Sequence, residues 1–240
     1  MSRREFRRAL LLQVGDLLPR TGFTKLLGSP APFAALYYKI WKGLAMVLCV
    51  EISWHYDDRF TASFGLSRTF TWSFPPKCSP PTGVYERLGH FLTTAERRRI
   101  LSAGFWGDGI KDAWWIGCKS ETLQAFLEAV RLCEPRFLNQ PALRDGILAC
   151  EAISHHAAMV DAIVQRVERN EVNLTITRNT IPSAWQHAAE EVVREKRPEY
   201  LKQQYVAGLA LDAWRVAKYF GETGTSEIPP TKVDVIRPEE

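Results

Sequence analysis

Hydrophobic and polar side chains alternate with a period of two along most of the segment from Leu36 to Trp72. Such alternation is typical of β-strands, whose successive side chains point to opposite faces of a sheet. The pair Lys42-Gly43 predicts a tight turn between the first two strands, and the pair Asp57-Asp58 predicts another before the third. The pattern therefore predicts an antiparallel β meander, to which a short segment at Phe23–Leu27 adds a fourth strand.

The two long strands of this meander differ between their two faces. Large apolar side chains occupy one face, from Leu44 to Trp54 in the second strand and from Phe60 to Trp72 in the third. The other face carries small hydroxyl side chains: Ser53, Thr61, Ser63, Ser67, Thr69 and Thr71. An antiparallel sheet can leave one face to water. We therefore expect the hydroxyl face to be exposed, either simply solvated or used as a flat docking surface.

Apolar residues at helical spacing predict helices before and after the meander. A capping-box sequence, Ser2 with Glu5, begins a helix that we expect over Arg3–Leu18, and Thr93 with Glu96 begins another. The remaining elements expected in this half are a short helix over Val84–Phe91, a short strand within Ala113–Cys118, and a helix that Ser120 caps and Pro135 ends.

Beyond Pro135 the pattern is helical only. Helices are predicted over Pro141–Arg169, from Ser183 to before Pro198, and over Pro198–Gly221. We therefore expect an α+β fold, with an N-terminal helix on an antiparallel β meander and flanking helices in residues 1–134, and a helical part packed on it in residues 135–220. Residues 221–240 hold three prolines and five acidic against two basic side chains, a net charge of −3, and we expect a disordered tail there.

Composition excludes several classes of protein. With 46% apolar and 24% charged residues, the 240-residue chain has the proportions of a globular protein. The longest nearly uncharged stretch, Gly43–Val50, is far shorter than the ~20 residues of a membrane helix, and Ala9–Leu12 is too short for a signal peptide. Five cysteines without a C-x-x-C pair predict neither a zinc or redox site nor a disulfide framework. We therefore expect a soluble, cytoplasmic protein without membrane contact.

The basic side chains are mostly arginines, 21 against 10 lysines, in a chain of net charge +4. Because the guanidinium group binds carboxylates and phosphates through a planar fork, this composition is consistent with an acidic partner, either a protein or a nucleic acid. Arginine-rich codon usage in the host is the alternative explanation. No nucleic-acid motif is present, but some side chains could serve such a partner. Candidate base-stacking surfaces are Trp72, Trp106, Trp114 and Trp115, and candidate phosphate contacts are Arg97-Arg98-Arg99 with Arg87, Arg3, Arg4, Arg7 and Arg8.

No catalytic motif is recognisable in the sequence, and we expect no cofactor and no metal. Glu151 and His155 are four apart on a predicted helix and could share a metal ion, but no spacing suggests further ligands. Glu51 and His55 are four apart on a predicted strand, ~13 Å along its axis, so the two side chains cannot touch. An unrecognised enzymatic site around His55, His90 or the Glu151/His155 pair stays open.

Three parts of the sequence carry a resemblance to a known class. They are the opening Glu5-Phe6-Arg7-Arg8-Ala9-Leu10, the pair Gly22-Phe23 after the first helix, and the strand pair Val47–Trp72. In the order of these elements the chain resembles small bacterial domains of unknown function, the DUF4304 class, over at most residues 1 to 130. It also resembles, in general style, immunity proteins that neutralise a toxin encoded beside them. The class has no catalytic signature, so the resemblance implies no functional residues.

The sequence thus favours a non-enzymatic bacterial protein that binds another protein, as an immunity or antitoxin-like inhibitor does. The residues predicted to contact the partner lie on or near the expected polar face: Arg68, Trp72, Thr69, Thr71 and Glu51. The alternative is a nucleic-acid-binding accessory subunit of a bacterial defence or mobile-element system. Salt dependence separates the two, because phosphate binding weakens steeply as salt rises.

Overall fold

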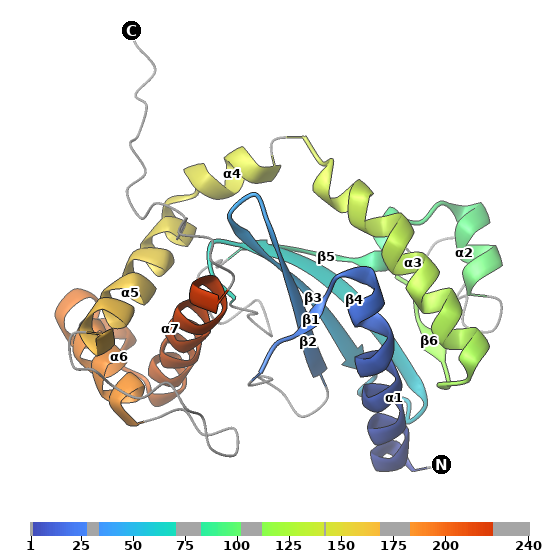
Figure 1. Ribbon diagram of the computed structural model, residues 1–240, viewed down its shortest axis with the longest axis horizontal. Coiled ribbons are helices and arrows are strands. Elements are labelled where there is room, and N and C mark those ends of the chain that lie inside the picture. The colour runs from blue at the N-terminus through green and yellow to red at the C-terminus, as the bar shows by residue number, and fades with distance from the viewer. Residues whose placement is uncertain are drawn as a thin grey trace, which may run out of the picture. The chain divides into compact units, whose positions relative to one another are not determined.

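A computed structural model describes residues 2–27, 34–70, 83–101, 112–141, 143–168 and 183–222. The fold is α+β, as predicted (Figure 1). The chain divides into two compact units. Unit 1 consists of Met1–Lys39, Met46–Leu66 and Tyr85–Leu143, and unit 2 consists of Ile40–Ala45, Ser67–Val84 and Arg144–Glu240.

The described strands form one antiparallel sheet in which spatial order follows chain order, β1-β2-β3-β4-β5, with β6 paired to β4. Thr24 of β1 lies opposite Tyr38 of β2, and Arg59 of β4 lies opposite Ile116 of β6. The predicted meander and its short fourth strand are therefore confirmed. The strand bounds are β1 (Thr24–Lys25), β2 (Ala34–Trp41), β3 (Leu44–Ile52), β4 (Arg59–Ser67), β5 (Gly83–Arg87) and β6 (Trp115–Ile116).

The turn between β2 and β3 is the predicted pair Lys42-Gly43. Both residues have positive φ, 48° and 75° respectively. Two successive positive φ angles define the hairpin turn whose twist matches that of the flanking strands. Glycine adopts such a φ without steric cost, which explains its place at the second position.

Two predictions about the strand region require correction, one of a helix and one of strand length. The expected helix over Val84–Phe91 is instead β5 followed by a short 3₁₀ helix, η2 (Leu88–Phe91). Val84 and Tyr85 are good strand formers, and pairing with β4 outweighs the weak helical spacing. The long strands are also shorter than predicted, because β3 ends at Ile52 and β4 at Ser67.

Aromatic packing builds the core of unit 1 on the apolar face of the sheet. Phe60 stacks on Trp115 with ring centroids 5.7 Å apart and meets Phe126 edge-on at 5.3 Å. Phe64 stacks on Phe137 at 5.4 Å and on Phe23 at 6.3 Å. Aromatic pairs at these distances add to the stabilisation that burial of apolar area supplies.

The helices of unit 1 begin largely where the sequence predicts. They are α1 (Arg3–Leu17), η1 (Leu18–Thr21), α2 (Thr94–Ile100) and α3 (Ser120–Leu138). Both predicted capping boxes are present, with reciprocal hydrogen bonds between Ser2 and Glu5 and between Thr93 and Glu96. The prediction for α3 is wrong at both ends. Its N-cap is Lys119 and makes no side-chain hydrogen bond, and the helix continues past Pro135, whose missing N–H removes only one helical bond.

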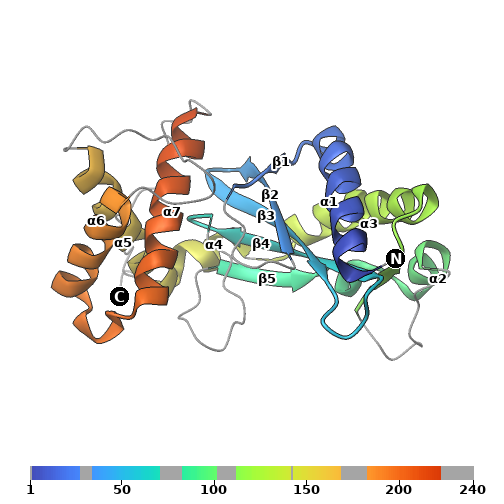
Figure 2. The same ribbon diagram turned by 90° about the horizontal axis from the view of Figure 1, so that it is seen from below.

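Unit 2 contains three long helices that pack against one another, α5 (Glu151–Glu168), α6 (Ser183–Lys196) and α7 (Gln203–Glu222) (Figure 2). The single helix predicted over Pro141–Arg169 is two helices, α4 (Leu143–Ala149) and α5, bent by 66° at Cys150. The last helix begins at Gln203 rather than at Pro198, which opens the 3₁₀ helix η3 (Pro198–Tyr200). The predicted tail from residue 223 onward lies outside the described residues.

Across the part of the chain that the structure describes, no single helix has the length and apolar composition to cross a membrane. The bent pair α4 and α5 meets that criterion only when the two helices are counted together.

Candidate functional site

The polar face of β3 and β4 is covered, so the expected exposed docking surface is wrong for the residues described. All nine residues of β3 are buried, and in β4 only Arg59 is partly exposed. Glu51 is 6% exposed, while Arg68 and Thr69 are each 2% exposed. Thr71 and Trp72, the other two predicted contact residues, lie outside the described residues. Alternation correctly groups side chains by face but does not reveal what covers each face.

Glu51 belongs to a buried polar cluster in unit 1. The Ser63 hydroxyl donates to Glu51 Oε1 at 3.4 Å, and Arg87 Nη2 lies 3.3 Å from Glu51 Oε2. Burial raises the pKa of Glu51, and the Arg87 guanidinium partly opposes that rise. The carboxyl group is therefore held inside the sheet by its neighbours and does not contact His55.

A second carboxylate, Asp112, lies beside this cluster. The Thr61 hydroxyl donates to Asp112 Oδ1 at 3.5 Å, and the Trp114 indole N–H donates to Oδ2 at 3.1 Å. Asp112 also raises the pKa of Glu51 through like-charge repulsion. Hydrogen bonds within the protein thus replace water on the polar face, which explains how the hydroxyl side chains can be buried.

Arg68 lies in unit 2, where it contacts α5. Its Nη1 donates to the Ser154 hydroxyl at 3.0 Å. Asp161 of α5 has a pKa raised to about 6 by burial, and the charge of Arg68 opposes that rise. The neighbouring segment is also held in place, because the Thr69 N–H donates to the Ser67 hydroxyl and Arg215 of α7 donates to the Phe70 carbonyl. Arg68 is thus a buried structural side chain.

The helices of unit 2 hold a buried ionisable pair that the sequence analysis missed. His156 Nε2 of α5 lies 3.0 Å from Asp212 Oδ2 of α7, and both side chains are buried. The two residues are 56 positions apart, so spacing could not reveal the pair. One signal was available, because each residue interrupts the apolar stripe of an amphipathic helix. A catalytic base must reach a substrate, and this pair is closed to solvent.

The histidines named in the sequence analysis, His55, His90 and His155, do not lie together in one site. His55 is exposed, and its backbone N–H donates to the Ser53 hydroxyl. His90 of η2 pairs with Glu86 of β5, four residues earlier in the chain. His155 Nε2 accepts a hydrogen bond from Arg197, and burial followed by the Arg197 charge lowers the pKa of His155. Among the described residues, no group of three or more His, Cys, Asp or Glu side chains could hold a metal ion.

Among the described residues, the most exposed aromatic side chains lie in the connection between β3 and β4. Trp54 is 60% exposed and Tyr56 is 44% exposed, within five consecutive exposed residues, Trp54–Asp58. We name this segment the aromatic tip. The sequence pattern placed Trp54 on the buried apolar face, and that prediction is wrong because β3 ends two residues earlier.

The Ser53 side chain explains why β3 ends before the aromatic tip. Its hydroxyl accepts the backbone N–H groups of His55 and Tyr56, each at 3.2 Å, so the chain turns instead of continuing the strand. The Ser53 N–H still donates to the Arg59 carbonyl, and the Asp58 carbonyl accepts the Gly117 N–H at 2.7 Å. The aromatic tip is therefore fixed at both ends.

Arginine side chains brace the aromatic tip. Arg3 of α1 donates to the carbonyls of Ser53 and Trp54. The Arg59 guanidinium lies 3.8 Å from the centre of the Tyr56 ring, in cation–π geometry. From Arg3, the exposed side of α1 continues with Arg4, Arg8 and Leu12, which share one helical face, and Leu12 is 67% exposed. Exposed aromatic and basic side chains thus adjoin at this end of the sheet.

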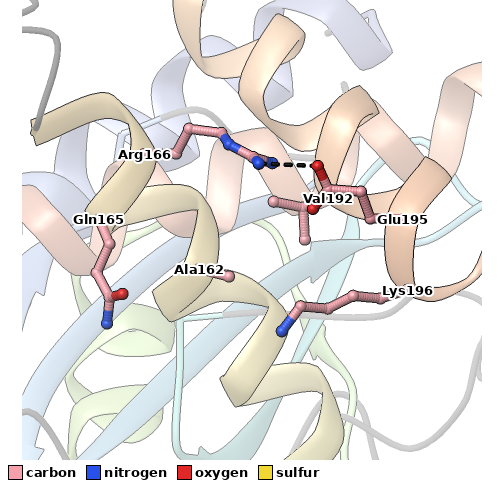
Figure 3. Close-up of a pocket in the computed structure, with 6 residues that line it drawn as sticks. All are labelled: Ala162, Gln165, Arg166, Val192, Glu195 and Lys196. Carbon is pink, nitrogen blue, oxygen red and sulfur yellow. Dashed lines mark hydrogen bonds and ion pairs between the residues drawn. The ribbon is translucent and has the colours of Figure 1, made fainter.

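Hollows lined by described residues occur in both units, and we describe one in each. The smaller, of about 170 Å³, lies between α5 and α6 in unit 2, where the ion pair of Arg166 and Glu195 lines it (Figure 3). The larger, of about 420 Å³, lies in unit 1 between the end of α2, β6 and the first turns of α3. We name the larger one the α3 cavity. Its volume falls within the range of small-molecule sites, ~300–1,000 Å³.

No family model matches the chain, and neither the curated proteins nor the solved structures searched give a match.

Proposed function

We propose that this protein is a non-enzymatic binding protein that uses the aromatic tip to dock on another protein, in the manner of an immunity or antitoxin-like inhibitor. The observation that carries the proposal is the exposure of Trp54 and Tyr56 on a braced turn. Tryptophan, tyrosine and arginine dominate binding hot spots, because each brings a large contact area together with a polar group. A turn that is fixed before binding loses little conformational entropy when a partner docks.

The charge around the aromatic tip favours an acidic protein surface as the partner. Arg3 donates to the Trp54 carbonyl, and Arg4 and Arg8 follow it along the exposed side of α1. A partner that presents an apolar pocket rimmed by carboxylates would match both features. Exposed Asp57 and Asp58 within the same turn oppose an acidic protein and a nucleic acid alike, so the attraction rests on the arginines, and nuclease and salt distinguish the two kinds of partner.

The buried titratable groups support the non-enzymatic part of the proposal. Glu51 and the pair of His156 with Asp212 have partners inside the protein and lie away from solvent. Catalytic groups need access to a substrate, whereas these side chains satisfy one another within the core. Their arrangement is that of structural polar clusters.

The test expresses the protein together with the products of the genes that flank its own, one at a time, and measures growth and binding. We expect one product to inhibit growth, to be neutralised by the native chain, and to bind it with one-to-one stoichiometry after nuclease treatment. The double variant Trp54→Ala/Tyr56→Ala should weaken binding at least a hundredfold, whereas Leu201→Ala, at an exposed apolar residue of unit 2, should not.

Three results would overturn the proposal. The first is a partner that binds the double variant as tightly as it binds the native protein. The second is binding that disappears on nuclease treatment and falls steeply with salt, which would assign the tip to nucleic acid. The third is a set of flanking gene products none of which binds.

A further inference from the structure

The two ends of the aromatic tip are held by different elements of unit 1. At its start, Arg3 of α1 donates to the carbonyls of Ser53 and Trp54. At its end, the Asp58 carbonyl accepts the N–H of Gly117, the residue that follows β6. Trp54 therefore lies on the α1 side of the aromatic tip, and Asp58 lies on the β6 side.

The α1 side of the aromatic tip is basic. The first two turns of α1, Arg3–Leu10, carry four arginines and one glutamate, a net charge of +3. Arg4 and Arg8 are both exposed and lie one helical turn apart. The glutamate, Glu5, accepts the Ser2 N–H within the capping box. A surface that approaches from this side therefore meets mainly guanidinium groups.

The end of the aromatic tip on the β6 side is acidic. Asp57 and Asp58 are both exposed, and the Asp58 side chain is 57% exposed. The next residue in the chain, Arg59, is a cation but is mostly covered. Its side chain is 19% exposed, its Nε lies 4.0 Å from Asp58 Oδ1, and its guanidinium group lies over the Tyr56 ring. The carboxylates thus face solvent, while the neighbouring cation is largely buried.

From this asymmetry we propose that the partner carries carboxylates on one side of the pocket that receives the aromatic tip and basic side chains on the other. The inference rests on the proposed function and names the charge pattern that the same docking surface recognises. Carboxylates lie opposite Arg4 and Arg8, and lysines or arginines lie opposite Asp57 and Asp58. Complementary charges across an interface fix the orientation of the partner and speed association, whereas a uniformly acidic surface is repelled at the aspartates.

Association kinetics with the flanking gene product that binds the native chain test this charge pattern. Stopped-flow fluorescence at 50 mM NaCl measures the association rate constant. We expect Arg4→Gln/Arg8→Gln to slow association at least ~fivefold and Asp57→Asn/Asp58→Asn to slow it at least ~twofold, because each double variant removes attractive charges. Both effects should shrink at 500 mM NaCl, where salt screens exposed charges.

Matched control variants change the same number of charges in unit 2. Arg144→Gln/Lys202→Gln removes two exposed cations there, and Asp145→Asn/Glu168→Gln removes two exposed carboxylates. Because these side chains belong to the other unit, we expect each control to change the association rate constant by less than ~1.5-fold.

The outcomes separate this inference from the proposed function. Faster association of Asp57→Asn/Asp58→Asn would show a uniformly acidic partner, and unchanged association of Arg4→Gln/Arg8→Gln would show that the arginines are not read. Either result overturns the charge pattern and leaves the aromatic tip as a docking surface. Native binding by the aromatic double variant described above overturns the proposed function and this inference with it.

Heparin, a polymer of uniform negative charge, tests the same surface without the partner. On heparin-agarose we expect Arg4→Gln/Arg8→Gln to elute at lower NaCl concentration than the native chain. Asp57→Asn/Asp58→Asn should elute at higher NaCl concentration, the opposite of its expected effect on the partner, because the aspartates repel a uniform polyanion. Shifts no larger than those of the matched controls in unit 2 would contradict the asymmetry.

Discussion

Two neighbouring regions differ in their exposure to solvent: the polar face of β3 and β4 is buried, whereas the turn that joins these strands is exposed. Thr61, Ser63 and Glu51 have side chains suited to water, yet they are buried and hydrogen-bonded within the protein. Trp54 and Tyr56 have side chains suited to a core, yet they face solvent. The difference teaches that polar side chains on β3 and β4 mark internal hydrogen bonding, whereas large exposed aromatic side chains appear just after β3 ends.

The largest expected effect contrasts one aromatic residue from each region. Phe64→Ala removes a ring packed against Phe137 and Phe23, and we expect it to lower the free energy of unfolding by ~3–5 kcal/mol. Trp54→Ala removes a more exposed ring, and we expect a change within ~0.5 kcal/mol. Urea denaturation followed by circular dichroism measures both. If the two variants lost similar free energies of unfolding, the contrast between a buried strand residue and an exposed turn residue would be wrong.

Arginine offers a second contrast of the same kind. Arg68→Ala removes a buried guanidinium that donates to Ser154, and we expect a loss of ~2 kcal/mol, the size of a hydrogen bond from a charged group. Arg4→Ala removes an exposed guanidinium from α1 and should change stability by less than ~0.5 kcal/mol. The same denaturation experiment applies. If Arg68→Ala unfolds no more easily than Arg4→Ala, Arg68 does not stabilise its unit.

Asp161 of α5, whose pKa the charge of Arg68 influences, predicts a pH dependence of stability. Burial raises the pKa of Asp161 from its ordinary 3.8 to about 6, so the folded protein holds this proton more tightly than the unfolded chain does. Stability from this group is therefore full below pH 4 and is lost as pH rises from about 4 to about 6. In Asp161→Asn this loss should disappear from melting temperatures measured across that range, while Asp145→Asn, at an exposed carboxyl of α4, should retain it. An unchanged pH profile in Asp161→Asn would refute the assignment.

The smallest effects concern two glycines and have opposite signs. Gly43 has a φ of 75° in the turn before β3, so Gly43→Ala should destabilise the protein by ~1 kcal/mol. Gly208 lies inside α7, and an added methyl group there meets nothing within 4 Å. Gly208→Ala should therefore stabilise by ~0.5–1 kcal/mol, because alanine has the higher helix propensity. Thermal melts of the two variants that shift in the same direction would contradict this account.

Local signals account for the parts of the fold that the sequence predicted correctly. The hairpin turn at Lys42-Gly43 and the capping boxes at Ser2 and Thr93 depend on residues within four positions of one another. The helix predicted over Val84–Phe91 was wrong because pairing with β4, which lies earlier in the chain, makes the first part of this segment a strand. The exposed turn after β3 was also missed, although it begins at Ser53, whose hydroxyl accepts two backbone N–H groups.

The candidate sites depended on distant contacts and were harder to predict. Arg68 meets Ser154 across 86 positions, and His156 meets Asp212 across 56. The α3 cavity combines the end of α2 with β6 and the start of α3, which are separated along the chain. The sequence could show which residues were unusual, but only the fold shows which of them meet.

The order of the strands also has a consequence for the way this protein is made. Because β1 to β5 are neighbours in the order of synthesis, each new pairing can form as soon as its second strand leaves the ribosome. The rings of Phe126 and Phe137, which cover Phe60 and Phe64, are translated more than sixty residues after those strand residues. During that interval Phe60 and Phe64 lack the rings that cover them in the finished protein, so the nascent sheet is more prone to aggregate than the folded one.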